Sequence, residues 1–174
     1  MPNVDTMAKL TQSHYSVDGK KGKKNRDDGS NVISVKGTDV SNMKDLVSDA
    51  KLGLGLSSSD KQFKQRRNEI KKIYRNSEGD NYLTGHSLGS SIALSSLAKS
   101  KSIRDNTKSS YGFNTGYTQA FHSEISKGLS KTDKKEIKGI RTNYHVSGDL
   151  VSTELNNNSL GEVQVVKPEK GATL

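Results

Sequence analysis

A chain of 174 residues, 29% of them hydrophobic, is long enough for one domain but has few apolar residues with which to build its core. The absence of cysteine excludes disulfides and thiolate metal sites, and the net charge of +9 favours attraction to anionic surfaces. No apolar leader and no run of membrane-spanning length is visible, so we expect a soluble protein. Its localisation is unknown from the sequence, although the lack of cysteine favours the cytoplasm.

Residues 1–30 form a polar, basic segment ahead of a domain that we place at residues 31–174. The charge of this segment is concentrated in a glycine-flanked run at residues 20–26. Such a run is usually a solvated hairpin turn or a loose terminus, and the alternative is a basic arm that touches an anionic surface. Tyr15 and Val17 could begin a strand that returns through residues 32–35.

The β-branched run from Asn31 to Val35 predicts a buried strand, and a helix is expected over residues 41–49. Between them lies Lys36-Gly37-Thr38. A strand that ends in Gly-Thr can offer a backbone N–H and a hydroxyl at one point, which is half of an oxyanion hole. Taken alone, Gly-Thr is an ordinary turn.

Residues 52–59 predict a flexible, partly apolar loop, which is either a plain connector or a lid. A helix capped by Ser59 or Asp60 should then run to about Arg75. Its apolar face comprises Phe63, Ile70, Ile73 and Tyr74. The rest of its surface is basic, which either keeps the helix soluble or binds anionic lipid.

The next strand, which contains Tyr82, leads into Gly85-His86-Ser87-Leu88-Gly89, and a helical pattern follows. This is the G-x-S-x-G pattern of a nucleophile elbow in a strand–turn–helix context. We call residues 85–89 the elbow. Gly85 and Gly89 meet the need for small residues around a strained serine, because a β-carbon there would clash with the turn or the helix. The turn should lift the Ser87 hydroxyl above the edge of the sheet and aim the Leu88 N–H at a developing oxyanion.

The remaining elements alternate between helices and strands. In the helix after the elbow, apolar side chains recur at helical spacing among small serines that allow close packing on a sheet. The elements expected beyond it are a strand with its exit turn at 110–116, helices at 118–125 and 132–138, and strands at 140–146 and 163–166. Thr132 is the expected cap of the second of these helices. The alternation predicts an α/β fold with a mainly parallel sheet flanked by helices. Asp149 lies just past a strand end, where a triad acid belongs.

Three of these segments, in this order, resemble the class 3 lipase family of the α/β-hydrolase fold. They are Lys36-Gly37-Thr38, the elbow, and Gly148-Asp149-Leu150-Val151, with weaker likenesses at Ser41, Asp45-Leu46, Asp49 and Tyr111 to Gly116. The likeness covers roughly residues 31–166, so the fold would be incomplete relative to that of the family. The family's arginine is replaced by Lys36.

The resemblance implies Ser87 as the nucleophile and Asp149 as the acid that orients a histidine. It implies an oxyanion hole made by the Leu88 N–H and Thr38. The reaction would be hydrolysis of a lipid or other carboxylic ester through an acyl-enzyme. Neither a cofactor nor a metal is expected, since the four histidines show no ligand spacing.

The catalytic histidine is the departure from this pattern. The chain order of the fold is Ser, Asp, His, but no histidine follows Asp149. His86 and His145 suit structural roles, His14 lies in the polar segment, and His122 would need an unusual order. Either the sequence stops short of its natural end, or the scaffold is kept without its activity. Whether the chain is an enzyme is therefore uncertain.

Three functions compete. The first is a lipase-like serine esterase whose partners are a lipid or ester substrate and an anionic membrane surface. The second is an inactive hydrolase scaffold that binds within a larger protein assembly. Nucleic-acid binding ranks last, because it rests on charge alone and only 5% of the residues are aromatic.

Overall fold

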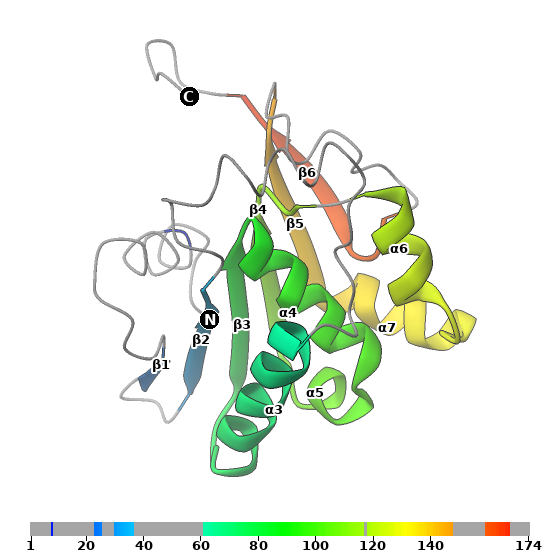
Figure 1. Ribbon diagram of the computed structural model, residues 1–174. Helices are drawn as coiled ribbons and strands as arrows, with labels where there is room; N and C mark the ends of the chain where they lie inside the picture. Colours follow the sequence, from blue (N-terminus) through cyan, green and yellow to red (C-terminus); the bar gives the residue numbers. More distant parts are fainter. Residues whose placement is uncertain are drawn as a thin grey trace.

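The computed structural model describes residues 8, 23–25, 30–36, 61–116, 118–147 and 159–167 (Figure 1). Its centre is a six-stranded sheet in the order β1-β2-β3-β4-β5-β6. The strands are β1 (Lys23–Asn25), β2 (Asn31–Val35), β3 (Asn81–His86), β4 (Ser109–Phe113), β5 (Arg141–Val146) and β6 (Glu162–Val166). β1 and β2 are antiparallel, and β2 to β6 are parallel. The predicted α/β fold with a mainly parallel sheet is confirmed.

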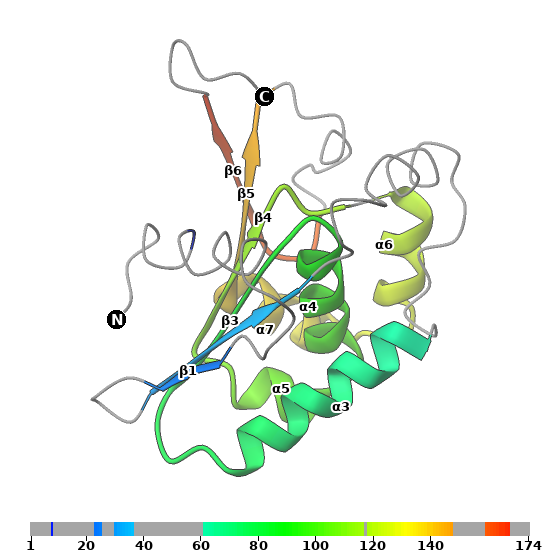
Figure 2. The same cartoon turned by 60° about the vertical axis from the view of Figure 1, so that its left-hand side comes forward.

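The helices of the described chain gather on one face of this sheet (Figure 2). They are α3 (Lys61–Arg75), α4 (Leu88–Lys99), α5 (Lys101–Asp105), α6 (Gln119–Ser126) and α7 (Lys131–Ile140). From β2 to β6, neighbouring strands follow one another in the chain, so every connection steps in the same direction. Right-handed connections that all step one way place their helices on the same face.

Helix α4 lies at the centre of the core. It contacts β2, β3 and β4 on one side and α3, α5, α6 and α7 on the other. Residues Leu88 to Ala98 are all buried, although the helix carries four serines among them. Small side chains at these positions let the helix axis approach the sheet closely, as the sequence predicts.

The parallel register brings the carboxyl ends of the strands to one edge of the sheet. Val35 at the end of β2 is paired with Gly85, and Gly85 is paired with Gly112 of β4. Phe113 of β4 is paired with Tyr144 of β5. The loops that follow β2, β3, β4 and β5 therefore all begin at this edge, where ligand sites of open α/β sheets lie.

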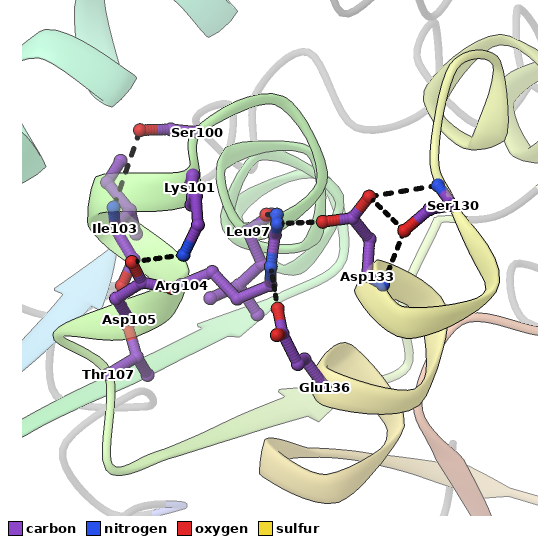
Figure 3. Close-up of polar contacts among 10 residues, drawn as sticks. All are labelled: Leu97, Ser100, Lys101, Ile103, Arg104, Asp105, Thr107, Ser130, Asp133 and Glu136. Atoms are coloured by element: carbon purple, nitrogen blue, oxygen red, sulfur yellow. Dashed lines mark hydrogen bonds and ion pairs between the residues drawn. The ribbon is translucent and has the colours of Figure 1, made fainter.

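At the opposite end of α4, Arg104 joins three helices (Figure 3). Its Nη1 donates to the carbonyl oxygen of Leu97 at 2.9 Å, and its Nε donates to Glu136 Oε2 at 2.9 Å. Its Nη2 forms an ion pair with Asp133. The Arg104 side chain is only 4% exposed, and both carboxylates belong to α7. The buried charge is thus matched by two opposite charges.

Two local predictions need correction. The N-cap of α7 is Ser130 rather than Thr132: the Ser130 hydroxyl accepts from Asp133 N at 3.1 Å, while the Asp133 carboxylate accepts from Ser130 N at 2.9 Å. This reciprocal pair satisfies two free N–H groups at once, which a single Thr132 hydroxyl cannot do. The short helix α5 was not predicted, and Ile140 ends α7 instead of opening β5.

Several predicted features lie outside the described residues: the strand at Tyr15 and Val17, the helix at 41–49, the loop at 52–59 and the cap at Ser59 or Asp60. β1 falls inside the basic segment 1–30 and pairs with β2, with Lys23 opposite Ile33. The boundary at residue 30 stays a prediction.

Candidate active site

Ser87 is the single residue between β3 and α4. Its backbone angles are φ 50° and ψ −123°. A positive φ is uncommon for a residue with a β-carbon and carries strain of about 1–3 kcal/mol. The surroundings hold it there: Ser87 N donates to the carbonyl oxygen of Phe113 at 3.0 Å, and the Ser87 carbonyl accepts from Ser90 N at 3.0 Å and Gly116 N at 3.4 Å. The turn is therefore fixed on one side by α4 and on the other by β4 and the loop after it.

The two glycines of the elbow lie against each other. A β-carbon on Gly85 would come within 2.6 Å of the carbonyl carbon of Gly89 and 2.7 Å of Ser90 N. Backbone atoms cannot yield to such a contact as the end of a flexible side chain can. The spacing of the two glycines thus has a direct steric reason, because β3 and the first turn of α4 touch there.

The chemical groups of the turn are the Ser87 hydroxyl and the N–H of Leu88. Ser87 is 6% exposed, and its hydroxyl makes no capping hydrogen bond to α4. Leu88 opens α4, and the first N–H groups of a helix have no acceptor within it. The partial positive charge of a helix N-terminus adds to that N–H. This arrangement can stabilise negative charge beside the serine oxygen.

Thr38 and Asp149, the other residues predicted for the site, lie outside the described residues. The strands ahead of them are described. β2 is the direct neighbour of β3 and ends three residues before Thr38, and β5 ends at Val146, three residues before Asp149. Adjacent strands lie about 4.8 Å apart, so both segments leave the sheet within about 10 Å of the elbow strand.

Asn114 fixes the end of β5 at this edge. It lies in the turn after β4 with a φ of 43°, a conformation that asparagine tolerates better than most residues. Its N–H donates to the Tyr144 carbonyl at 2.8 Å, and its Oδ1 accepts from Val146 N at 3.0 Å. Asn114 was not among the residues predicted for the site, although a polar residue in the segment predicted as a strand and its exit turn was the available signal.

The described histidines lie in three different elements. His86 ends β3, His145 is paired with Val165 within the sheet, and His122 lies in α6. His14 lies outside the described residues.

The family model of the Tle-like phospholipase domain, a phospholipase-like family, matches residues 5–173. The chain belongs to this family. This match supports a lipase- or phospholipase-like protein. Its function is then like that of a lipid ester hydrolase, which is consistent with lipid substrates. The particular likeness to class 3 lipases is not shown by this match, so the resemblance holds at the coarser level. A comparison with curated proteins finds no match.

Beneath the elbow, this Tle-like phospholipase domain contains a buried polar cluster that the sequence analysis missed. We call it the Arg141 cluster, and its members are Arg141, Ser90, Ser110, Thr115 and Asn143. Arg141 Nε donates to Asn143 Oδ1 at 2.9 Å, and Nη1 donates to Ser110 Oγ at 2.8 Å. Nη2 donates to Ser90 Oγ, with longer contacts to the Ser90 carbonyl at 3.4 Å and Thr115 Oγ1 at 3.5 Å.

The charge of the cluster is unusual for its depth. Arg141 is 1% exposed, and no described carboxylate pairs with it. Burial lowers the pKa of Arg141 to about 9, so the guanidinium is still protonated at neutral pH. The sequence of β5 does not reveal that Arg141 is buried, because an arginine at the first position of a strand can point outward or inward without changing the alternation that follows.

Neither a metal centre nor a membrane span is visible in the described parts of this Tle-like phospholipase domain. There, no three metal-ligating side chains come together, and no helix combines the length and apolarity that crossing a bilayer demands.

Proposed function

We propose that this Tle-like phospholipase domain hydrolyses a lipid carboxylic ester through an acyl-enzyme on Ser87. The observation that carries the proposal is the strained turn at Ser87, which joins a central parallel strand to a buried helix N-terminus. A serine in that position presents its hydroxyl next to the N–H of Leu88, so attack and charge stabilisation occur at one point. The family match to a phospholipase-like domain supports a lipid ester as the substrate class.

In the proposed reaction, Ser87 Oγ attacks the ester carbonyl and gives its proton to a histidine base. The Leu88 N–H and Thr38 stabilise the oxyanion. The carbonyl re-forms, the alcohol leaves with the proton from the base, and Ser87 carries the acyl group. Water activated by the same base then releases the acid. Asp149 orients the base, and this role is supported by β5, which ends three residues before Asp149 at the edge of the sheet where the elbow lies.

The base is the open part of this scheme, because no histidine follows Asp149 in the 174 residues. His122 is the candidate within the chain, and it lies in α6, which packs against α4. Without a base, a serine hydroxyl is a weak nucleophile. Added imidazole can take the place of a missing histidine, so it serves as a probe of an incomplete triad.

The test measures the hydrolysis of a soluble nitrophenyl ester and of phospholipid vesicles, with and without imidazole. Ser87→Ala is the control for background hydrolysis. We expect wild-type turnover above that of Ser87→Ala, and a mass increase equal to one acyl group on the peptide that contains Ser87. Equal rates in both proteins under every condition would overturn the proposal and favour the inactive scaffold within a larger assembly.

The lipid surface itself is expected to meet the basic face of α3. This helix exposes four basic residues, Lys61, Lys64, Lys72 and Arg75. On its opposite face it buries Phe63, Ile70 and Tyr74. Binding to vesicles with anionic lipid should weaken as salt is raised, since exposed charges are screened within about 8 Å at physiological ionic strength. A Lys64→Glu, Lys72→Glu double variant should bind less. Unchanged binding of that variant would argue against this surface.

A further inference from the structure

Burying the Arg141 guanidinium is costly, because a cation loses its hydration in the interior. A buried cation is tolerated when an anion pairs with it. Among the described residues its partners are neutral oxygens of Ser90, Ser110, Thr115 and Asn143. Its hydrogen bonds are satisfied and its charge is not compensated there.

Its location adds a second unfavourable contribution. Ser90, which accepts from the guanidinium through its hydroxyl and carbonyl oxygens, is the third residue of α4. It follows Leu88 by two residues, a rise of about 3 Å along the helix. A helix N-terminus already carries partial positive charge, so a cation beside it is disfavoured. The guanidinium and the positive end of the α4 dipole therefore lie close together, and an anion at the elbow would be attracted to both.

Two glycines lie close against the Arg141 side chain. A β-carbon on Gly112 would lie 1.9 Å from Arg141 Nη2, and one on Gly161 would lie 2.5 Å from Arg141 Cγ. Gly112 pairs with Gly85 of the elbow, and the next residue, Phe113, accepts from Ser87 N. The backbone at Gly112 and Gly161 thus confines the side chain, whose Nη2 lies against the first turn of α4. Thr115 lies in the loop after β4 and is hydrogen-bonded to Ser90 Oγ at 2.6 Å, so it connects Ser90 to that loop.

We propose that Arg141 is a positioning residue for the reaction at Ser87. It holds the first turn of α4 through Ser90 and the loop after β4 through Thr115, and its charge lies beneath the point where the oxyanion forms. This inference rests on the proposed function and extends it to a residue that never touches the substrate. The described residues of the cluster include no anion, and the proposed transition state brings one to the elbow. Departures from ordinary burial rules of this kind occur at functional sites.

The experiment compares Arg141→Met and Arg141→Lys with Arg104→Met as the matched control. Arg104 is the other buried arginine of the described chain, and it lies at the far end of α4. Steady-state kcat and KM are measured on a soluble ester, along with the rate of Ser87 labelling by a fluorophosphonate. All assays run well below the melting temperature of each variant.

We expect Arg141→Met to lower kcat about 100-fold with little change in KM, because a contribution made only in the transition state is lost. Arg141→Lys keeps the positive charge but lacks the planar guanidinium with its several N–H donors. We therefore expect its kcat to be about tenfold higher than that of Arg141→Met. Arg104→Met should keep the wild-type kcat. Labelling rates should follow the same order.

Folded Arg141→Met with wild-type kcat, or an equal loss in Arg104→Met, would overturn the inference and leave the proposed function intact. Wild type that labels no faster than Ser87→Ala, with and without imidazole, would overturn the proposed function and this inference with it. If Arg141→Met does not fold, Thr115→Val decides. This variant removes one acceptor of the guanidinium and the hydrogen bond between Ser90 and the loop after β4. We expect kcat to fall several-fold at unchanged KM, and wild-type kcat in Thr115→Val would reject the inference.

Discussion

Arg104 and Arg141 are two buried arginines at opposite ends of the same helix, and they are treated differently. Arg104 has two carboxylates from α7 and a backbone carbonyl. Arg141 has hydroxyls, an amide and a carbonyl, and no described carboxylate. The first arrangement neutralises a charge that joins helices together. The second keeps a charge in place beneath the elbow, and this difference is what separates the supporting end of the fold from its candidate active end.

The largest effect is expected when space is removed around Arg141. Gly112→Ala places a methyl group 1.9 Å from Arg141 Nη2 and 2.3 Å from Ser90 Oγ, so the guanidinium must move and lose its partners. Breaking up a buried charged group of this kind costs about 3–5 kcal/mol. Urea denaturation should show the loss, and ester turnover should fall with it. Wild-type stability in Gly112→Ala would mean that the guanidinium is held less tightly than the contacts imply.

Removing the paired arginine should have a smaller effect. Arg104→Met leaves Asp133 and Glu136 without their partner, but their side chains are 27% and 42% exposed and can be solvated by water. We expect a loss of about 2–3 kcal/mol in the free energy of unfolding, with kcat unchanged. A drop in kcat measured below the melting temperature would erase the contrast between the two arginines.

The Ser130 cap supports the Arg104 side and gives it a pH dependence. Hydrogen bonds from the side chain and backbone of Ser130, with the charge of Arg104 as a smaller cause, lower the pKa of Asp133 below its ordinary value. A carboxyl group whose pKa is lower in the folded state stabilises the fold above its unfolded pKa of about 3.9 and loses that contribution as pH falls further.

Ser130→Ala should therefore cost about 1 kcal/mol at neutral pH, and the difference from wild type should shrink below about pH 4. Thermal melts of both proteins from pH 7 to pH 3 measure it. A difference that stays constant over this range would mean that the carboxylate of Asp133 does not contribute through the cap.

The smallest effect, of opposite sign, is expected at Gly139 in α7. A β-carbon there meets nothing within 4 Å, and its φ is not positive. Gly139→Ala should stabilise the protein by about 0.5–1 kcal/mol through helix propensity. It is the matched control for Gly112→Ala, since the same change is made in the open on the Arg104 side. Destabilisation by Gly139→Ala would show that α7 contacts something besides the described residues.

Most elements of the fold were predictable because they depend on neighbours in the chain. The β-branched run of β2, the periodicity of α3 and the glycine spacing of the elbow are local patterns. The helix α5 was missed because five residues carry too little periodicity. The cap of α7 was placed at Thr132 because the threonine alone was considered, whereas the pair Ser130 and Asp133, three residues apart, would have identified it.

The sequence by itself determined the order of strands and helices, the fold class and the sharp turn at Ser87, since each follows from the size and polarity of consecutive residues. Tertiary structure decided which side chains share the space under that turn. Ser90, Ser110 and Arg141 come from three different elements, and Arg141 is 51 residues from Ser90 in the chain. Only the closing of the sheet against α4 brings them together. The effect of the Arg141 charge depends on this arrangement, because electrostatic interactions depend on distance in space and on burial and not on position along the chain.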